Sequence, residues 1–198
     1  RSKIFHYGSL SMTHDKNYEA TQYAIQVAKD NGCLISFDPN LRLSLWKTPE
    51  EARRRILYGM KQCDIMKISE EEVAFVSEQE SLEKGVSFIR DNSDIKILFV
   101  TLGNKGSIAY YKDEKIYCGG IHQEHVVDTT GAGDTFCGAV LSRILELGTD
   151  ALTEKDIREM LLFANAAASI VVTRKGALCS MPEPEEIRAA SSLIDKVL

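Results

Sequence analysis

The sequence has few of the features that would place the protein in a specialised class. Its five cysteines are odd in number and never spaced as C-x-x-C, and its four histidines show no metal-ligand spacing. These patterns indicate neither a disulfide framework nor a zinc site. No apolar run approaches the roughly 18 residues of a membrane-spanning helix, and the N-terminus has no signal-peptide pattern. We therefore expect a cytoplasmic protein with no membrane partner.

The sequence also lacks a basic surface of the kind that binds nucleic acid. Its formal net charge is −5, and its one short cationic run, at residues 53–55, falls in a segment with a helical pattern. Broad phosphate-binding surfaces are rich in Lys and Arg, so we expect no nucleic-acid partner and a solvated helix face at this run. The remaining composition is ordinary for a globular chain long enough to bury a core.

Short apolar runs alternate with segments of helical periodicity along the chain. The expected strands are residues 4–7, 33–37, 64–68 and 96–101, followed by a hairpin at 107–111 and 115–118. The expected helices are residues 17–30, 48–62, 69–76, 81–92, 134–147, one beginning near 153, and 185–197. We expect Tyr23, Ile25, Val27 and Ala28 on the apolar side of the first helix. This alternation predicts a single α/β domain over residues 1–198, with a doubly wound, mostly parallel sheet flanked by helices.

The most informative stretch is residues 126–136, which read VVDTTGAGDTF. It predicts the end of a β-branched strand, a glycine turn, and an acid that opens a helix. Gly131 and Gly133 let consecutive backbone N–H groups point into one concavity, to which the helix adds its positive end. We therefore expect an anion site with Asp134 beside it, placed to accept a proton. The alternative is an ordinary strand-to-helix turn with an Asp cap.

Polar residues follow the second expected strand, where the sequence reads DPNLR at residues 38–42. In open α/β sheets, ligands bind at the carboxyl ends of the parallel strands. The pattern predicts that Asp38 and Arg42 contact a substrate or its phosphates. The alternative is a Pro-Asn turn with a structural Asp. The three acids at residues 70–72 open a helix, where any one of them can simply complement the helix dipole.

Residues 128–134 match every fixed position of D-T-x-G-A-G-D, the signature of the PfkB (ribokinase-like) carbohydrate kinases. Residues 37–42, 67–72, 100–106 and 163–182 resemble the same family in the same order. Within it, residues 6–9, 37–42 and Trp46 look most like fructokinases. The resemblance implies a ribokinase-like, Rossmann-like fold. Members run to roughly three hundred residues, so we expect this chain to be the C-terminal two thirds of a member, without the N-terminal part and lid.

The resemblance also implies an activity and its residues. The activity is ATP-dependent phosphorylation of a sugar hydroxyl, fructose to fructose 6-phosphate, with Asp134 as the catalytic base. Backbone N–H groups of Gly131, Ala132 and Gly133 would stabilise the transferring phosphoryl group. The residues implied at the nucleotide are Thr101, Gly103, Gly106 and Asn165. Glu72 would organise Mg²⁺, although Ser69 stands where the family motif N-x-x-E has Asn. The ligands implied for a monovalent cation such as K⁺ are Asp128, Thr130, Val171, Arg174, Gly176 and Ser180.

Two alternatives to a fructokinase stay open from the sequence. A PfkB kinase for ribose, 2-keto-3-deoxygluconate or a nucleoside would differ mainly upstream of Arg1, and Arg42 could pair with a substrate carboxylate. A non-catalytic nucleotide-binding fragment or scaffold would keep the fold without the chemistry. The expected partners are a small sugar and ATP, and pairing into a homodimer is an open question for the full-length parent.

Overall fold

The protein is described here by a computed structural model of residues 2–176 and 178–194. Contacts between Cα atoms divide the chain into two compact units, Arg1–Val100 and Thr101–Leu198. The single domain over residues 1–198 stays a prediction. In the described part of the chain, no helix is both long enough and apolar enough to cross a membrane.

The first unit alternates strands with helices. Its strands are β1 (Ile4–Gly8), β2 (Leu34–Asp38), β3 (Ile65–Ser69) and β4 (Ile97–Thr101), which lie in that order. Its helices are α1 (Asp15–Asp30), α2 (Pro49–Gln62), α3 (Glu70–Ser77) and α4 (Leu82–Asp91), with 3-10 turns η1 (Ser9–Met12) and η2 (Leu43–Leu45). β1 pairs with β2, and β2 with β3, both in parallel. The parallel pairing directs the carboxyl ends of these strands to one edge.

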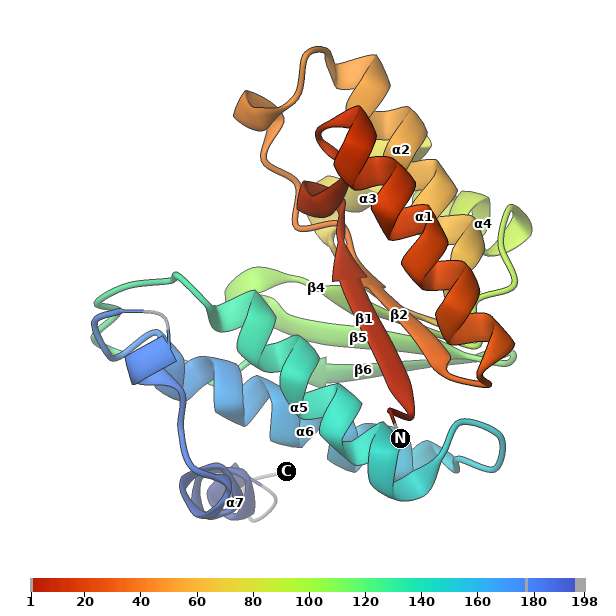
Figure 1. Cartoon of the computed structure of the whole chain (residues 1–198). Coiled ribbons are helices and arrows are strands. Elements are labelled where there is room, and N and C mark those ends of the chain that lie inside the picture. The colour runs from red at the N-terminus through yellow and green to blue at the C-terminus, as the bar shows by residue number, and fades with distance from the viewer. Residues whose placement is uncertain (1, 177, 195–198) are drawn as a thin grey trace. The chain divides into compact units, whose positions relative to one another are not determined.

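Local sequence explains where the helices of this unit begin. Thr48 caps α2 by accepting a hydrogen bond from the Glu51 N–H, and Pro49 occupies the first helical position. Ser69 and Glu72 form a reciprocal capping box at the start of α3. Both arrangements satisfy N–H groups that have no partner within the helix. Figure 1 shows α1 and α2 side by side, where the rings of Tyr18 and Tyr58 meet edge to face.

The second unit contains an antiparallel hairpin and three helices. The hairpin strands are β5 (Gly106–Tyr111) and β6 (Glu114–Gly119), and the helices are α5 (Ala132–Leu147), α6 (Glu154–Val171) and α7 (Pro184–Ile194). Short 3-10 turns lie at Gly103–Lys105 (η3) and Leu178–Ser180 (η4). α5 runs beside α6 (Figure 1), and α6 contacts both hairpin strands. The end of the last expected helix, residues 195–197, lies outside the described residues. Parallel strands, an antiparallel hairpin and alternating helices confirm the predicted α/β class.

The expectations for the buried face of α1 and for a strand at residues 126–128 were wrong. In α1 the buried residues are Thr21, Ile25 and Ala28, whereas Tyr23 is 74% exposed and Val27 is 42% exposed. Spacings of four and three place the buried residues on one helix face, and Tyr23 and Val27 turn away from it. Residues 126–128 form no strand. The Val127 N–H instead donates to the Val172 carbonyl, just past the end of α6, at 2.8 Å.

The cationic run at residues 53–55 is not a solvated face, because Arg55 is buried. Its side chain is 3% exposed and forms ion pairs with Asp15 and Glu51. Its guanidinium also donates to the Met12 carbonyl and lies 4.7 Å from the centre of the Tyr18 ring. Arg55 therefore ties α2 to η1 and to the start of α1.

We predict that Arg55→Met lowers the free energy of unfolding by roughly 2–3 kcal/mol, because the Met12 carbonyl and the two carboxylates lose their donor. Urea unfolding followed by circular dichroism measures the change. Arg54→Met is the matched control, since Arg54 is the exposed neighbour in α2, and it should change the same quantity by less than about 0.5 kcal/mol. Equal effects of the two substitutions would contradict the role given to Arg55.

Candidate active site

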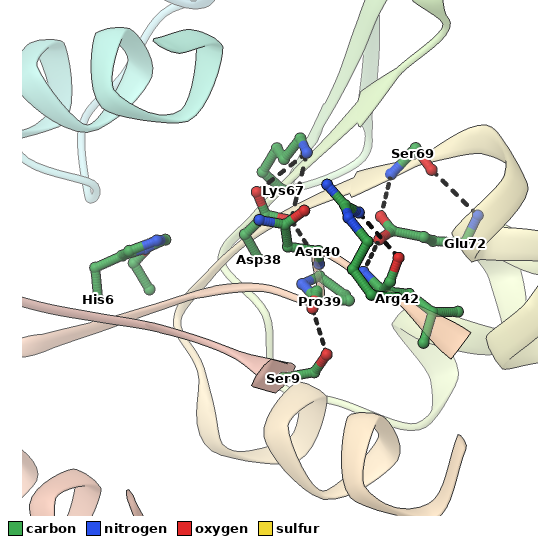
Figure 2. A network of polar contacts seen from close by, with 11 residues as sticks. His6, Ser9, Asp38, Pro39, Asn40, Arg42, Lys67, Ser69 and Glu72 are labelled. Carbon is green, nitrogen blue, oxygen red and sulfur yellow. Dashed lines mark hydrogen bonds and ion pairs between the residues drawn. The ribbon is translucent and has the colours of Figure 1, made fainter. Parts of the chain in front are cut away.

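A buried ion pair lies at the carboxyl ends of β2 and β3 (Figure 2). Asp38 is the last residue of β2, and Lys67 of β3 donates to its two carboxylate oxygens at 3.3 and 3.1 Å. Asp38 is 3% exposed and Lys67 is 7% exposed. The Asn40 N–H adds a third hydrogen bond to Asp38, at 3.1 Å. Asp38 therefore holds the turn that follows its own strand and a cation from the next strand.

The turn after Asp38 is also held from η1, the 3-10 turn that follows β1. The backbone N–H of Ser9 donates to the Pro39 carbonyl at 3.1 Å, and the Ser9 hydroxyl donates to the same oxygen. Figure 2 shows Ser9 directed at Pro39 from below the turn. Asn40 adopts a positive φ of 45°, which Asn tolerates better than most residues. The position of this turn is thus determined by hydrogen bonds from β2 and from η1.

Glu72, predicted to organise Mg²⁺, joins the same turn to α3. Its Oε1 accepts the Leu41 N–H at 2.7 Å, and its Oε2 accepts the Ser69 N–H at 2.9 Å. Each carboxylate oxygen has a second lone pair for a metal ion or a metal-bound water. The metal role of Glu72 stays a prediction alongside this structural one. Arg42 is exposed, and its guanidinium donates to the Leu41 carbonyl at 2.9 Å, so its contact with a substrate also stays a prediction.

Burial raises the pKa of Asp38 to about 6, and the negative charge of Glu72 acts in the same direction. Lys67 and the Asn40 N–H oppose this by favouring the ionised form. Sequence reasoning did not single out Lys67. The signal was a lysine inside the otherwise apolar run Ile65-Met66-Lys67-Ile68, because a cation within a buried strand requires a partner.

The second unit contains a pocket of about 440 Å³. Six of the predicted site residues line it, namely Thr101, Gly103, Gly106, Ala132, Gly133 and Asn165. The structure therefore brings the residues predicted for the nucleotide together with part of the predicted anion site. Sequence reasoning missed residues 120–123, which also line the pocket. The available signal was the Gly119-Gly120 pair at the end of the hairpin.

The predicted anion site lies at the start of α5. The helix begins at Ala132, two residues earlier than expected, with Gly131 as its N-cap at a φ of 83°. This left-handed conformation favours glycine. The Ala132 N–H donates to the Thr129 carbonyl at 3.3 Å, within the loop. Asp134 follows in the first helical turn and is exposed. The roles of Gly131, Ala132, Gly133 and Asp134 in catalysis stay predictions.

The structure also brings the predicted monovalent-cation residues together. Asp128 accepts the Thr130 N–H at 2.9 Å and the Gly176 N–H at 3.4 Å. The bond from Thr130 is the main reason that the pKa of Asp128 lies below its ordinary value. The Asp128 carboxylate is thereby favoured in its ionised form, and it joins the loop before α5 to the loop after α6.

Three carbonyls of residues 171–180 accept hydrogen bonds from within the same segment. The Val171 carbonyl accepts the Arg174 N–H at 3.0 Å, and the Gly176 carbonyl accepts the Ser180 hydroxyl at 2.6 Å. The Arg174 guanidinium donates to the Ser180 carbonyl at 3.4 Å and pairs with Glu186. Within residues 2–176 and 178–194, no group of three or more His, Cys, Asp or Glu side chains could hold a metal ion. A monovalent cation would depend on carbonyls and on Asp128.

Comparison with known proteins shows the family to which this chain belongs. The family described as pfkB family carbohydrate kinase matches residues 2–184. The chain belongs to the pfkB family. Fructokinase-1 of Oryza sativa subsp. japonica is 41% identical over 189 residues, which are 94% of this chain and 58% of the relative. This pfkB chain therefore spans little more than half the length of that curated relative.

Two solved structures confirm the ribokinase-like fold of this pfkB chain. The fructokinase from Vibrio cholerae O395, in its fructose, ADP and calcium ion bound form, has a TM-score of 0.87 and 31% identity. That match covers 96% of this chain and 60% of the other. Aminoimidazole riboside kinase from Salmonella enterica, complexed with aminoimidazole riboside and an ATP analog, has a TM-score of 0.85 and 25% identity, covering 97% and 63% of the two chains.

The burial of Asp38 predicts how the stability of the chain depends on pH. The folded pKa of Asp38, about 6, is above its ordinary value of 3.8, so the folded state holds this proton more tightly than the unfolded state. The resulting stabilisation is complete below the ordinary value and is lost as the pH rises through about 6. Asp38→Asn should remove this dependence from the free energy of unfolding.

Lys67→Met should raise the pKa of Asp38 further, because the carboxylate loses the cation that favours its ionised form. A pH titration of the aspartate carboxyl carbons by ¹³C NMR measures this pKa directly. Lys96→Met is the matched control, since Lys96 pairs with Asp64 at 3.6 Å and is 44% exposed. An unchanged or lower pKa of Asp38 in Lys67→Met would show that Lys67 does not stabilise the carboxylate.

Proposed function

We propose that the protein containing this chain transfers the γ-phosphoryl group of ATP to a sugar hydroxyl, with fructose as the acceptor and fructose 6-phosphate as the product. The observation that carries the proposal is the position of Asp134. It lies in the first turn of α5, directly after the pocket residues Ala132 and Gly133. A carboxylate at this point can accept the proton of an attacking hydroxyl next to a helix end that favours phosphate.

The pocket of the second unit is proposed to hold ATP. Its volume of about 440 Å³ lies in the range of small-molecule sites. Thr101, Gly103, Gly106 and Asn165 would bound the nucleotide. Backbone N–H groups of the loop over Gly131, Ala132 and Gly133 would face the transferring phosphoryl group, where fixed donors stabilise developing charge. The Ala132 N–H would have to exchange its bond to Thr129 for this role.

The acceptor and the metal ions are proposed to be held by the polar groups described above. Asp38 and Arg42 would contact the sugar or the phosphates, and Glu72 would hold Mg²⁺ directly or through water. Bound Mg²⁺ would neutralise charge on the ATP phosphates. Asp128 and Thr130, together with carbonyls of residues 171–180, would hold K⁺. Fructose is proposed because the rice relative is named a fructokinase and the Vibrio cholerae structure is titled as fructose-bound.

A second acceptor class is a riboside, because the aminoimidazole riboside kinase shares the fold at 25% identity. The deciding experiment measures ADP release from Mg-ATP in the full-length protein and in this 198-residue chain. The acceptor panel is fructose, glucose, ribose, 2-keto-3-deoxygluconate and adenosine. Fructose should give the highest kcat/KM in the full-length protein. A higher value for adenosine or ribose would replace the proposed acceptor, and ATP binding without release for any acceptor would favour a scaffold role.

We predict that Asp134→Asn lowers kcat by about 10²–10⁴-fold, because the amide cannot accept the proton while the neighbouring N–H groups stay in place. Affinity for ATP, measured by titration calorimetry, should stay within about twofold of the unsubstituted protein. Asp113→Asn, at the exposed turn between β5 and β6, is the matched control for loss of one negative charge. Normal turnover in Asp134→Asn would exclude Asp134 as the base.

We also predict that Asp128→Asn weakens activation by K⁺. The variant removes the charge that accepts the Thr130 and Gly176 N–H groups, so both the cation and the two loops lose a partner. The measurement is kcat as a function of KCl at constant ionic strength, with choline chloride as the balancing salt. The K⁺ concentration for half-maximal activity should rise at least about tenfold. If the kcat of the unsubstituted protein does not depend on K⁺, the proposed cation site is wrong.

A further inference from the structure

Asn165 lines the pocket, yet both the oxygen and the nitrogen of its side-chain amide have partners within the protein. Its Oδ1 accepts the hydroxyl of Ser107 at 3.0 Å, and its Nδ2 donates to the carbonyls of Cys118 and Gly119, both at 3.2 Å. Asn165 is 7% exposed and Ser107 is 0% exposed. A flipped amide would direct an acceptor at two carbonyl oxygens, so the network determines the orientation. No donor of this amide is left over for a ligand.

The partners of Asn165 belong to both strands of the hairpin. Ser107 lies in β5 opposite Cys118 of β6, and Gly119 is the last residue of β6. The chain then continues as residues 120–123, which line the pocket and are called the pocket wall below. Asn165 therefore joins α6 to the point from which the pocket wall departs.

Close backbone packing fixes the position of Gly120, the first residue of the pocket wall. The Gly120 N–H donates to the Lys105 carbonyl at 3.1 Å. A Cβ atom on Gly120 would lie 2.2 Å from the Asn104 carbonyl oxygen, and one on Gly106 would lie 2.2 Å from that of Cys118. Both approaches are possible only for glycine. The wall is thus seated by backbone contacts on η3 and by the Asn165 amide on α6.

We propose that Asn165 is a positioning residue that sets the pocket wall and does not read the nucleotide base. The proposal rests on the proposed function only for the statement that the ligand is a nucleotide. The amide could donate a hydrogen bond to a base only by giving up its bond to the Cys118 or the Gly119 carbonyl, which is costly for a buried group. Binding should therefore depend on Asn165 through the wall and to the same degree for every base.

The first test measures the wall without any ligand. In Asn165→Asp the acceptor for Ser107 is kept, but an oxygen replaces the two donors and faces the carbonyls of Cys118 and Gly119. Amide hydrogen exchange of Gly120, whose N–H is bonded to Lys105, should become at least about tenfold faster. Amides in the middle of α5 should change little. Ser107→Ala should accelerate Gly120 by about fivefold, because Asn165 loses its orienting donor.

The matched control is Ser142→Ala. Ser142 also donates its hydroxyl to a carbonyl, that of Ala139 at 2.8 Å, within α5. It should leave exchange of Gly120 unchanged. If exchange in Asn165→Asp becomes faster at all amides to the same degree, the variant is globally unfolded, and the result for Ser107→Ala decides instead. If exchange of Gly120 in Ser107→Ala is as slow as in Ser142→Ala, Asn165 does not set the wall and the proposal is wrong.

The second test compares nucleotides in the full-length protein. Dissociation constants of ATP, GTP and CTP should all rise by about tenfold in Asn165→Asp, with unchanged ratios among them. The combined effect of Asn165→Asp and Ser107→Ala should be smaller than the sum of the two, because both act through one contact. A loss confined to ATP would mean that Asn165 reads adenine and would overturn the proposal. Failure of the unsubstituted protein to bind any of the three would instead refute the proposed function, and hydrogen exchange would still decide the role of Asn165.

Discussion

Backbone N–H groups at the carboxyl ends of buried parallel strands need acceptors, and in the first unit two carboxylates supply them. Asp38 accepts from Asn40, and Glu72 accepts from Leu41 and Ser69. These N–H groups are partly buried, and a fully buried one without a partner would cost about 1–3 kcal/mol. The same acids form the polar edge where open α/β sheets bind ligands. The same side chains therefore hold the backbone and are proposed to bind ligands. A loss of activity on removing Glu72 could come from the lost acceptor for the Leu41 and Ser69 N–H groups or from the lost ligand for Mg²⁺.

The parts of the fold that follow from neighbouring residues could be predicted from the sequence. Alternating apolar runs gave the strands, and caps such as Thr48 gave the helix starts. The errors concern burial that depends on distant partners. Val127 has the branched side chain of a strand residue, but its N–H bonds to Val172 at the end of a helix. Arg55 looked solvated because its partners, Met12 and Asp15, come from another helix and turn.

In the candidate site, too, local features could be predicted from the sequence, whereas contacts between distant residues could not. Glycine spacing located the loop before α5 and the turn after β4, because their backbone conformation is a local property. Lys67 was overlooked because its partner Asp38 is 29 residues away. Asn165 was located by resemblance, but its bond to Ser107 spans 58 residues, and no local pattern indicates it. The sequence could thus name residues near the pocket without showing which of them face a ligand and which hold the protein.

The backbone contacts at Gly106 and Gly120 limit how the pocket can evolve. Any side chain at either position would collide with a carbonyl oxygen 2.2 Å away, so natural variation and laboratory libraries at these two positions would mostly yield distorted pockets. Ile121, His122 and Gln123 also line the pocket but carry side chains. Ligand preference can therefore vary at these three positions, while Gly106 and Gly120, which hold the backbone around them, are constrained to remain glycine.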